Sequence, residues 1–242
     1  MNKPLNNRVI MVTGAGSGIG REIALGYAHQ GATVLLLGKT ADKLTSLYDE
    51  MMEQGVPEPG IIPLDLATAS AADMQELGDI ILNNYGCLHG LLHNAAILGD
   101  RVPVEHYDLN TWLKVMHVNF TATCLLTRIL MPLLRLSDNA RLVFTTSSVG
   151  SAPRAYWGAY SVSKYALEGY AQLLFEELDN TSNISVCLVN PGATRTNMRA
   201  AAYPNEDPGT VPEPASLLPI YQHVMNPASD VHGNTYDKTW LK

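Results

Sequence analysis

Short apolar runs and amphipathic stretches alternate along the whole chain. Each run has the length and β-branched character of a buried strand, whereas the stretches between runs carry apolar residues at helical spacing. The runs predict strands at residues 8–13, 33–37, 61–64, 90–93, 141–146, 184–189 and 234–237. The intervening stretches predict helices at residues 18–30, 42–54, 71–84, 111–136, 159–178 and 215–225. This alternation predicts an α/β fold, a Rossmann-like doubly wound parallel sheet of about seven strands with helices on both faces.

The chain length suits one large domain. No repeat, linker or low-complexity tract divides the 242 residues, so we expect residues 1–242 to form a single unit. The regular alternation fades after Pro191, and residues 197–214 carry Pro204, Pro208 and Pro212, as surface loops do. We therefore expect a lid over a binding site near residues 197–225.

Composition and charge exclude several classes of function. The net charge of −7 argues against a nucleic-acid partner, which would require a basic surface. The chain has no continuous apolar run of about 18 residues, and its first residues lack a signal-peptide core, so we expect neither a membrane span nor export. Cys87, Cys124 and Cys187 lie far apart, which excludes a Cys-x-x-Cys metal or redox site. We expect a cytoplasmic protein without a metal ion.

A glycine-rich turn follows the first predicted strand. Gly14 allows a sharp turn, Gly18 lets the backbone approach a pyrophosphate, and Gly20 lets the helix pack closely on the sheet. The helix begins at Gly18-Ile19-Gly20, after Ser17, and presents free N–H groups to an anion. The turn therefore predicts a dinucleotide site. The spacing differs from Gly-x-Gly-x-x-Gly, and a tight turn without a ligand is the alternative.

A second candidate site combines Ser147 with Tyr160 and Lys164. Ser147 ends a predicted strand, and the spacing of four places Lys164 on the same helical face as Tyr160. A nearby ammonium should lower the phenol pKa, so that the phenol can exchange a proton with a carbonyl or alcohol while a hydride moves. Strand alternation allows only one of Ser147 and Ser148 to face the site. The alternative is that Tyr160 and Lys164 are an ordinary exposed pair four residues apart on a helix.

With these motifs the chain resembles the short-chain dehydrogenase/reductase superfamily, in its shorter, single-domain branch. The run Thr13-Gly-x3-Gly-x-Gly matches that branch, and the resemblance covers essentially the whole chain. It implies a catalytic set of Asn119, Ser147, Tyr160 and Lys164. In this set Ser147 binds the substrate oxygen, Lys164 also holds the nicotinamide ribose, and Asn119 anchors a water in a proton relay. Stabilising a helix kink is an equally open role for Asn119.

The resemblance also implies cofactor contacts. They comprise the adenine pair Asp65-Leu66, Asn94-Ala95 from an Asn-Asn-Ala-Gly motif, and the nicotinamide turn Pro191-Gly192 with Thr194 and Thr196. Within the superfamily, residues 97–100 and 190–196 are most similar to a bacterial group of uncharacterised oxidoreductases. His93 departs from the motif and is either a second catalytic base or, as we favour, a hydrogen-bonded structural histidine.

The residues after the second predicted strand discriminate between cofactors. An acidic side chain there would bind the ribose 2′-OH of NADH. This chain instead carries Lys39 and Thr40, with Ser17 in the facing loop, and Asp42 lies one helical turn too far along. A cation and two hydroxyls suit a 2′-phosphate, so we expect NADP(H). If Lys39 stays in solvent, neither cofactor is favoured.

These features predict an NADP(H)-dependent oxidoreductase with Tyr160 as general acid/base, acting on a carbonyl or secondary alcohol with apolar bulk. The alternative is an NADP(H)-binding redox sensor with little turnover, although a sensor need not keep the catalytic set. An epimerase or dehydratase would need a longer chain. Four residues either line an apolar substrate pocket or pack internally: Tyr156, Trp157, Met198 and Tyr203. Arg154 or Arg195 could bind an acidic substrate or remain solvated.

The two helices predicted at 111–136 and 159–178 carry many apolar residues. These include Leu125, Leu126, Ile129, Leu130, Leu133 and Leu134, and on the second helix Leu173, Leu174 and Phe175. One sheet face cannot cover them all, and the family pairs subunits through these helices. We therefore expect a homodimer or homotetramer, with a wholly internal core as the alternative.

Overall fold

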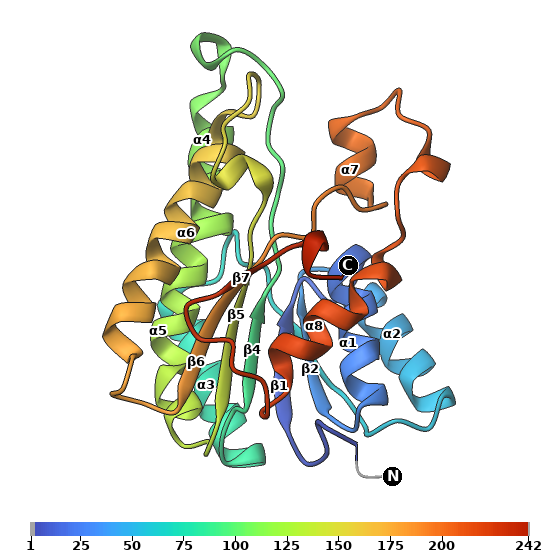
Figure 1. Cartoon of the computed structure of the whole chain (residues 1–242), viewed down its shortest axis with the longest axis vertical. Helices are drawn as coiled ribbons and strands as arrows, with labels where there is room; N and C mark the ends of the chain where they lie inside the picture. The colour runs from blue at the N-terminus through green and yellow to red at the C-terminus, as the bar shows by residue number, and fades with distance from the viewer. Residues whose placement is uncertain (1–2, 242) are drawn as a thin grey trace.

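A computed structural model describes residues 3–241 and joins seven strands in one sheet (Figure 1). The strands are β1 (Val9–Thr13), β2 (Thr33–Gly38), β3 (Gly60–Pro63), β4 (Gly90–His93), β5 (Ala140–Thr145), β6 (Ile184–Val189) and β7 (Thr235–Tyr236). Their order is β3-β2-β1-β4-β5-β6-β7, and every neighbouring pair is parallel. The strand order reverses between β1 and β4. The predicted Rossmann-like sheet is confirmed.

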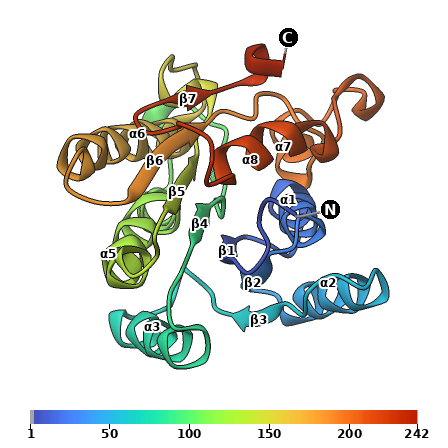
Figure 2. The same cartoon turned by 60° about the horizontal axis from the view of Figure 1, so that its bottom comes forward.

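Helices cover both faces of the sheet (Figure 2). One face carries α1 (Gly18–His29), α2 (Ala41–Glu53) and α8 (Leu218–Met225), and the other carries α3 (Ala71–Tyr85), α5 (Ala122–Arg135) and α6 (Gly158–Leu178). Each layer encloses its own hydrophobic core. Alternate residues of β1 enter opposite cores, Ile10 the first and Met11 the second. This is why β1 is a continuous apolar run rather than an alternating one.

The long helix predicted at 111–136 is interrupted. It consists of α4 (Leu109–Met116), a π-helical turn at His117–Thr121, and α5. A π turn inserts one extra residue and frequently marks a functional site, and here it contains Asn119. The stretch Leu109–Arg135 is long and apolar enough to span a membrane by length and composition, with a mean hydropathy of 1.2. Half of its most apolar window is buried in the fold, and it packs against α3 and α6.

The lid predicted at 197–225 cannot extend over that whole region. Its first residues form a short helix, α7 (Asn197–Ala202), where the prolines further on had suggested a loop. Its last residues are not a lid, because Leu217, Ile220 and Tyr221 are fully buried against α1 and the sheet. The prolines lie in the irregular segment between α7, which is outside the core, and α8, which packs in it. Among the described residues of this region, only 197–199, 202 and 203 line the cavity described below.

Candidate active site

A cavity of about 380 Å³ opens at the carboxyl ends of the strands, beside the point where the strand order reverses. Open α/β sheets bind their ligands at this position. The cavity is lined by the sequence-predicted residues Gly14, Ser17, Gly18, Ile19, Lys39, Thr40, Asp65, Leu66, Asn94, Ala95, Ser147, Tyr160, Lys164, Pro191, Gly192, Thr194 and Thr196. Two others, Gly20 and Asn119, lie behind the wall of the cavity.

The glycine-rich turn is held against the loop after β4 by a shared hydroxyl. Thr13 Oγ1 accepts hydrogen bonds from the backbone N–H groups of Asn94 and Ala95, both at 3.0 Å. Gly14 has a φ of +71°, which favours glycine. A Cβ on Gly20 would lie 2.4 Å from the Gly14 carbonyl oxygen, so a side chain there would separate helix from turn. The turn therefore has the close packing that a dinucleotide site needs.

The rim beside β2 is cationic. Lys39 and Thr40 are exposed and line the cavity, as does Lys43, one turn into α2. Sequence reasoning missed Lys43, although its place four residues after Lys39 at the start of a helix was a usable signal. Asp42 does not line the cavity. These residues fit a phosphate on the adenosine ribose, since two ammonium groups stand there without a facing carboxylate among the residues of β2 and α2 that line the cavity.

Ser147, Tyr160 and Lys164 come together at the centre of the cavity. Tyr160 and Lys164 are 8% and 2% exposed, and the Lys164 ammonium lies 5.7 Å from the centre of the Tyr160 ring. Lys164 Nζ donates to the Thr145 carbonyl oxygen at 2.8 Å. Burial lowers the pKa of Lys164 to about 8, and the carboxylate of Glu168 acts in the opposite direction.

The phenol does not have the lowered pKa that the sequence predicted. Burial raises the pKa of Tyr160 to about 12, and only its hydrogen bond with Ser147 counteracts this effect. The reason is geometric, because the ammonium is directed to the Thr145 carbonyl rather than to the phenol oxygen. A phenol with a raised pKa stays protonated at neutral pH, which is the state needed to donate a proton.

Glu168 is a supporting residue that the sequence reasoning missed. It lies one helical turn after Lys164, and its Oε1 accepts a hydrogen bond of 2.5 Å from the hydroxyl of Thr146. Its negative charge favours the protonated form of Lys164. The sequence shows that Glu168 follows Tyr160 and Lys164 at intervals of four residues on one helical face. It does not show that Thr146 lies next to Glu168.

Asn119 and His93 both have structural partners. Asn119 Oδ1 accepts from the Ile97 N–H at 2.8 Å, and its Nδ2 donates to the Ile97 carbonyl oxygen and to Ser163 Oγ, both at 3.0 Å. Asn119 thus ties the loop after β4 to α6 from within the π turn. His93 hydrogen-bonds Thr127 and stacks on Phe144, and burial lowers its pKa to about 3. It is therefore neutral, as the structural alternative predicted.

The turn after β6 closes the cavity opposite the glycine-rich turn. The Thr194 hydroxyl donates to the Pro191 carbonyl oxygen at 3.2 Å, and the Thr196 hydroxyl accepts from the Arg199 N–H at 3.1 Å at the start of α7. A Cβ on Gly18 would lie 3.1 Å from Thr196 Cγ2. The two turns therefore approach each other closely at Gly18 and Thr196, on the border of the cavity.

The remaining end of the cavity is largely apolar. Trp157, Met198 and Tyr203 line it, together with Arg154. Tyr156 does not line it and is 54% exposed, with a φ of +69° that turns it outward. Arg195 pairs with Glu213 at 2.9 Å outside the cavity. Three of the four candidate substrate contacts and one of the two candidate arginines thus reach this end.

Comparison with known proteins extends this picture. The sequence model of the short chain dehydrogenase family matches residues 8–207. The uncharacterised oxidoreductase YciK of Escherichia coli K12 is 47% identical over 221 residues, which is 91% of this chain and 87% of that protein. The predicted likeness to a bacterial group of uncharacterised oxidoreductases is confirmed.

Two solved structures have the same fold. A short chain dehydrogenase from Shigella flexneri, complexed with NADP, has a TM-score of 0.94 and 44% identity, covering 98% of this chain and 99% of that chain. A short chain dehydrogenase from Escherichia coli CFT073, complexed with NADPH, has a TM-score of 0.93 and 45% identity, covering 98% of both chains. Sequence and fold therefore agree that the chain belongs to the short-chain dehydrogenase family.

Proposed function

We propose that this protein is an NADP(H)-dependent oxidoreductase that transfers a hydride between the nicotinamide and a carbonyl or secondary-alcohol substrate. The observation that carries the proposal is the group formed by the buried Tyr160 and Lys164 and the half-buried Ser147, set in a cavity whose rim presents Lys39 and Lys43. The complexes of the two related bacterial structures with NADP and NADPH support the cofactor.

The roles of the residues follow from their positions. Bound NADPH supplies the hydride for the carbonyl carbon. Tyr160, protonated at neutral pH, gives its proton to the carbonyl oxygen, and the Ser147 hydroxyl donates a second hydrogen bond to that oxygen. Lys164 places an ammonium 5.7 Å from the centre of the Tyr160 ring, and the Glu168 carboxylate favours the charged form of Lys164. The products are the alcohol, the oxidised cofactor and the Tyr160 phenolate, which regains a proton from solvent before the next turnover.

A redox sensor on the same fold would bind the cofactor without turnover. A carbonyl panel assayed with NADPH, whose oxidation is followed by absorbance, separates the two functions. Tyr160→Phe should reduce kcat by about a hundredfold or more and leave the NADPH dissociation constant within about twofold. Tyr156→Phe is the matched control, because Tyr156 is exposed and does not line the cavity. Binding without turnover of any panel member would favour the sensor.

We also propose a cytoplasmic homodimer or homotetramer. Of the nine apolar residues on which this expectation first rested, eight are buried or packed against the second core, and only Leu173 is mostly exposed. The surface that remains apolar on α6 is formed by Val162, Tyr165 and Leu173, which recur at helical spacing. Light scattering should give a multiple of the 26.3 kDa chain mass, and a 26.3 kDa particle at micromolar concentration would refute the proposal.

A further inference from the structure

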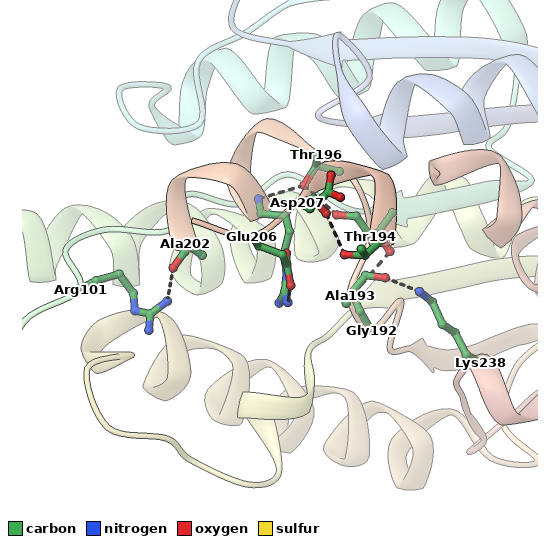
Figure 3. A network of polar contacts seen from close by, with 11 residues as sticks. Arg101, Gly192, Ala193, Thr194, Thr196, Ala202, Glu206, Asp207 and Lys238 are labelled. Carbon is green, nitrogen blue, oxygen red and sulfur yellow. Dashed lines mark hydrogen bonds and ion pairs between the residues drawn. The ribbon is translucent and has the colours of Figure 1, made fainter. Parts of the chain in front are cut away.

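One segment of the cavity wall is held from outside by two cations. This segment, residues 192–207, is here called the strap, and it includes α7. Figure 3 shows Arg101 reaching the strap near Ala202, and Lys238 reaching it at Ala193. Neither cation lines the cavity, yet both bind strap carbonyls beside residues that do. These two cations therefore bind the strap at two separate points.

Arg101 holds the substrate end. Its Nη1 donates to the Ala202 carbonyl oxygen at 2.9 Å, and its Nε donates to the Tyr156 carbonyl oxygen at 3.1 Å. The guanidinium carbon lies 4.2 Å from the ring centre of Trp157 and 5.3 Å from that of Tyr203. One side chain from the loop after β4 thus binds the loop before α6 and the strap, and touches two of the aromatic rings that line the cavity.

The planar guanidinium is needed for this arrangement. It can present N–H groups in its plane to two carbonyls while its face contacts the aromatic rings. An ammonium at the same place has three donors but is a compact charge without a planar face to lie against the rings. Arg101 therefore sets the spacing between Trp157 and Tyr203.

Lys238 holds the nicotinamide end. Its ammonium donates to the Ala193 carbonyl oxygen, and its stem passes Gly192, where a Cβ would lie 3.5 Å from Lys238 Cδ and Cε. Lys238 begins a 3-10 turn after β7, and the Asp237 carboxylate fixes this turn by accepting from the Thr239 N–H at 2.8 Å. The C-terminal part of the chain thereby supports the turn that faces Gly18.

Between these two points the strap is held by its own contacts. Arg199 forms a two-pronged ion pair with Glu206, at 2.7 and 2.5 Å, and its guanidinium carbon lies 3.7 Å from the centre of the Tyr203 ring. Both residues of this ion pair belong to the strap, so the pair does not attach the strap to the rest of the fold.

Arg195 attaches the strap to the segment that follows it, since its N–H donates to the Pro212 carbonyl oxygen at 2.8 Å and its side chain bonds Val211 and Glu213. Arg101 and Lys238 attach the strap to the loop after β4 and to the turn after β7, so its position over the cavity depends on them as well.

We propose that Arg101 and Lys238 are positioning residues with separate tasks, Arg101 for the substrate wall and Lys238 for the turn against the nicotinamide. That the two ends of the cavity bind the substrate and the nicotinamide rests on the proposed function. The separation itself follows from the fold, because the two cations come from different loops and bind opposite ends of the strap.

Methionine substitutions keep most of the stem of each side chain and remove its charge. Arg101→Met should raise KM for the best carbonyl about tenfold and leave kcat and the NADPH dissociation constant within about twofold. Lys238→Met should weaken NADPH binding about tenfold, measured by fluorescence titration. Lys238→Arg should restore binding because it keeps a donor, whereas Arg101→Lys should not restore KM. Arg135→Met, which removes an exposed cation at the end of α5, is the control and should change neither constant.

Amide hydrogen exchange tests the same division without turnover. Exchange should accelerate in residues 198–203 of Arg101→Met and in residues 192–196 of Lys238→Met, each with the other part unchanged. If no carbonyl is reduced but this pattern is found, the proposed function fails and the two positioning roles stand. If both variants accelerate exchange across the whole strap, or neither does, the division of tasks is wrong. Equal weakening of NADPH binding by both variants would also overturn it.

Discussion

The nucleotide end and the substrate end of the cavity are built in different ways. At the nucleotide end, backbone atoms form the wall directly after β1 and β4, and the hydroxyl of Thr13, the last residue of β1, binds the loop after β4. At the substrate end, the wall consists of side chains on loops and on α7, held by Arg101 through two carbonyls and two aromatic rings.

The difference shows how each end can change. A wall made of backbone at the ends of core strands is fixed by the sheet itself, so it tolerates little variation. A wall made of loop side chains and held by one long cation can be altered by a single substitution without disturbing the sheet. We therefore expect mutations to separate cofactor binding from substrate selection, and the following predictions test that separation.

The largest effect is expected where the two ends meet. Ser147→Ala removes a hydrogen bond to the substrate oxygen and to Tyr160, so kcat/KM for the carbonyl should fall about a hundredfold. Ser148 also lines the cavity, contrary to the simple alternation of strand residues, because the chain enters a 3-10 turn at that residue. Ser148→Ala should cost far less. The reverse order would show that Ser148 faces the substrate oxygen.

A smaller effect is expected from the backbone of the nucleotide end. Gly20→Ala places a Cβ 2.4 Å from the Gly14 carbonyl oxygen and 2.6 Å from Asn94 Nδ2. The free energy of unfolding should fall by about 1–3 kcal/mol, as for other overpacked sites. Gly78→Ala is the control, because its Cβ would meet nothing closer than 3.4 Å and Ala favours the helix. Chemical denaturation measures both, and equal stability of the two variants would contradict the close-packed turn.

Next comes the cationic rim. Lys39→Ala should weaken NADPH binding about tenfold, since a charged hydrogen bond to the 2′-phosphate is lost, and leave NADH binding unchanged. Paired titrations of NADPH and NADH measure this difference. Tighter binding of NADH than NADPH by the unmodified protein would overturn the cofactor preference. A small effect of Lys39→Ala with a large effect of Lys43→Ala would assign the phosphate to the residue that sequence reasoning missed.

The smallest effect is a pH dependence. Lys164 is charged below its pKa of about 8 and neutral above it. Since kcat/KM reports the free enzyme, its value for NADPH should fall about twofold between pH 7 and pH 8 as the ammonium loses its proton. A value that stays level or rises through this interval would show that Lys164 keeps its proton there.

The nucleotide end was largely predictable from the sequence. The turn requires glycine at Gly14, Gly18 and Gly20 because of its backbone geometry, and the strand before it is a short apolar run bounded by polar residues. Tyr160 and Lys164 were equally readable, because four residues is one helical turn. These signals are local, and local geometry follows from the covalent chain.

The substrate end was not predictable in the same way. Nothing near Arg101 in the sequence indicates Tyr156 or Ala202, which lie 55 and 101 residues away. The predicted lid extended too far because prolines mark irregular backbone but do not reveal which apolar residues return to the core, as Tyr221 does.

The sequence by itself determined the strand and helix pattern, the dinucleotide turn and the catalytic spacing, because each depends on residues within one or two helical turns. Only the tertiary structure decided the protonation of Tyr160, the structural role of His93 and the two points at which the strap is held. Burial raises the pKa of Tyr160 and lowers that of His93, and burial depends on how distant segments pack. The strap is held by Arg101 and Lys238, whose partners become neighbours only when the loop after β4 and the segment after β7 reach the same end of the sheet.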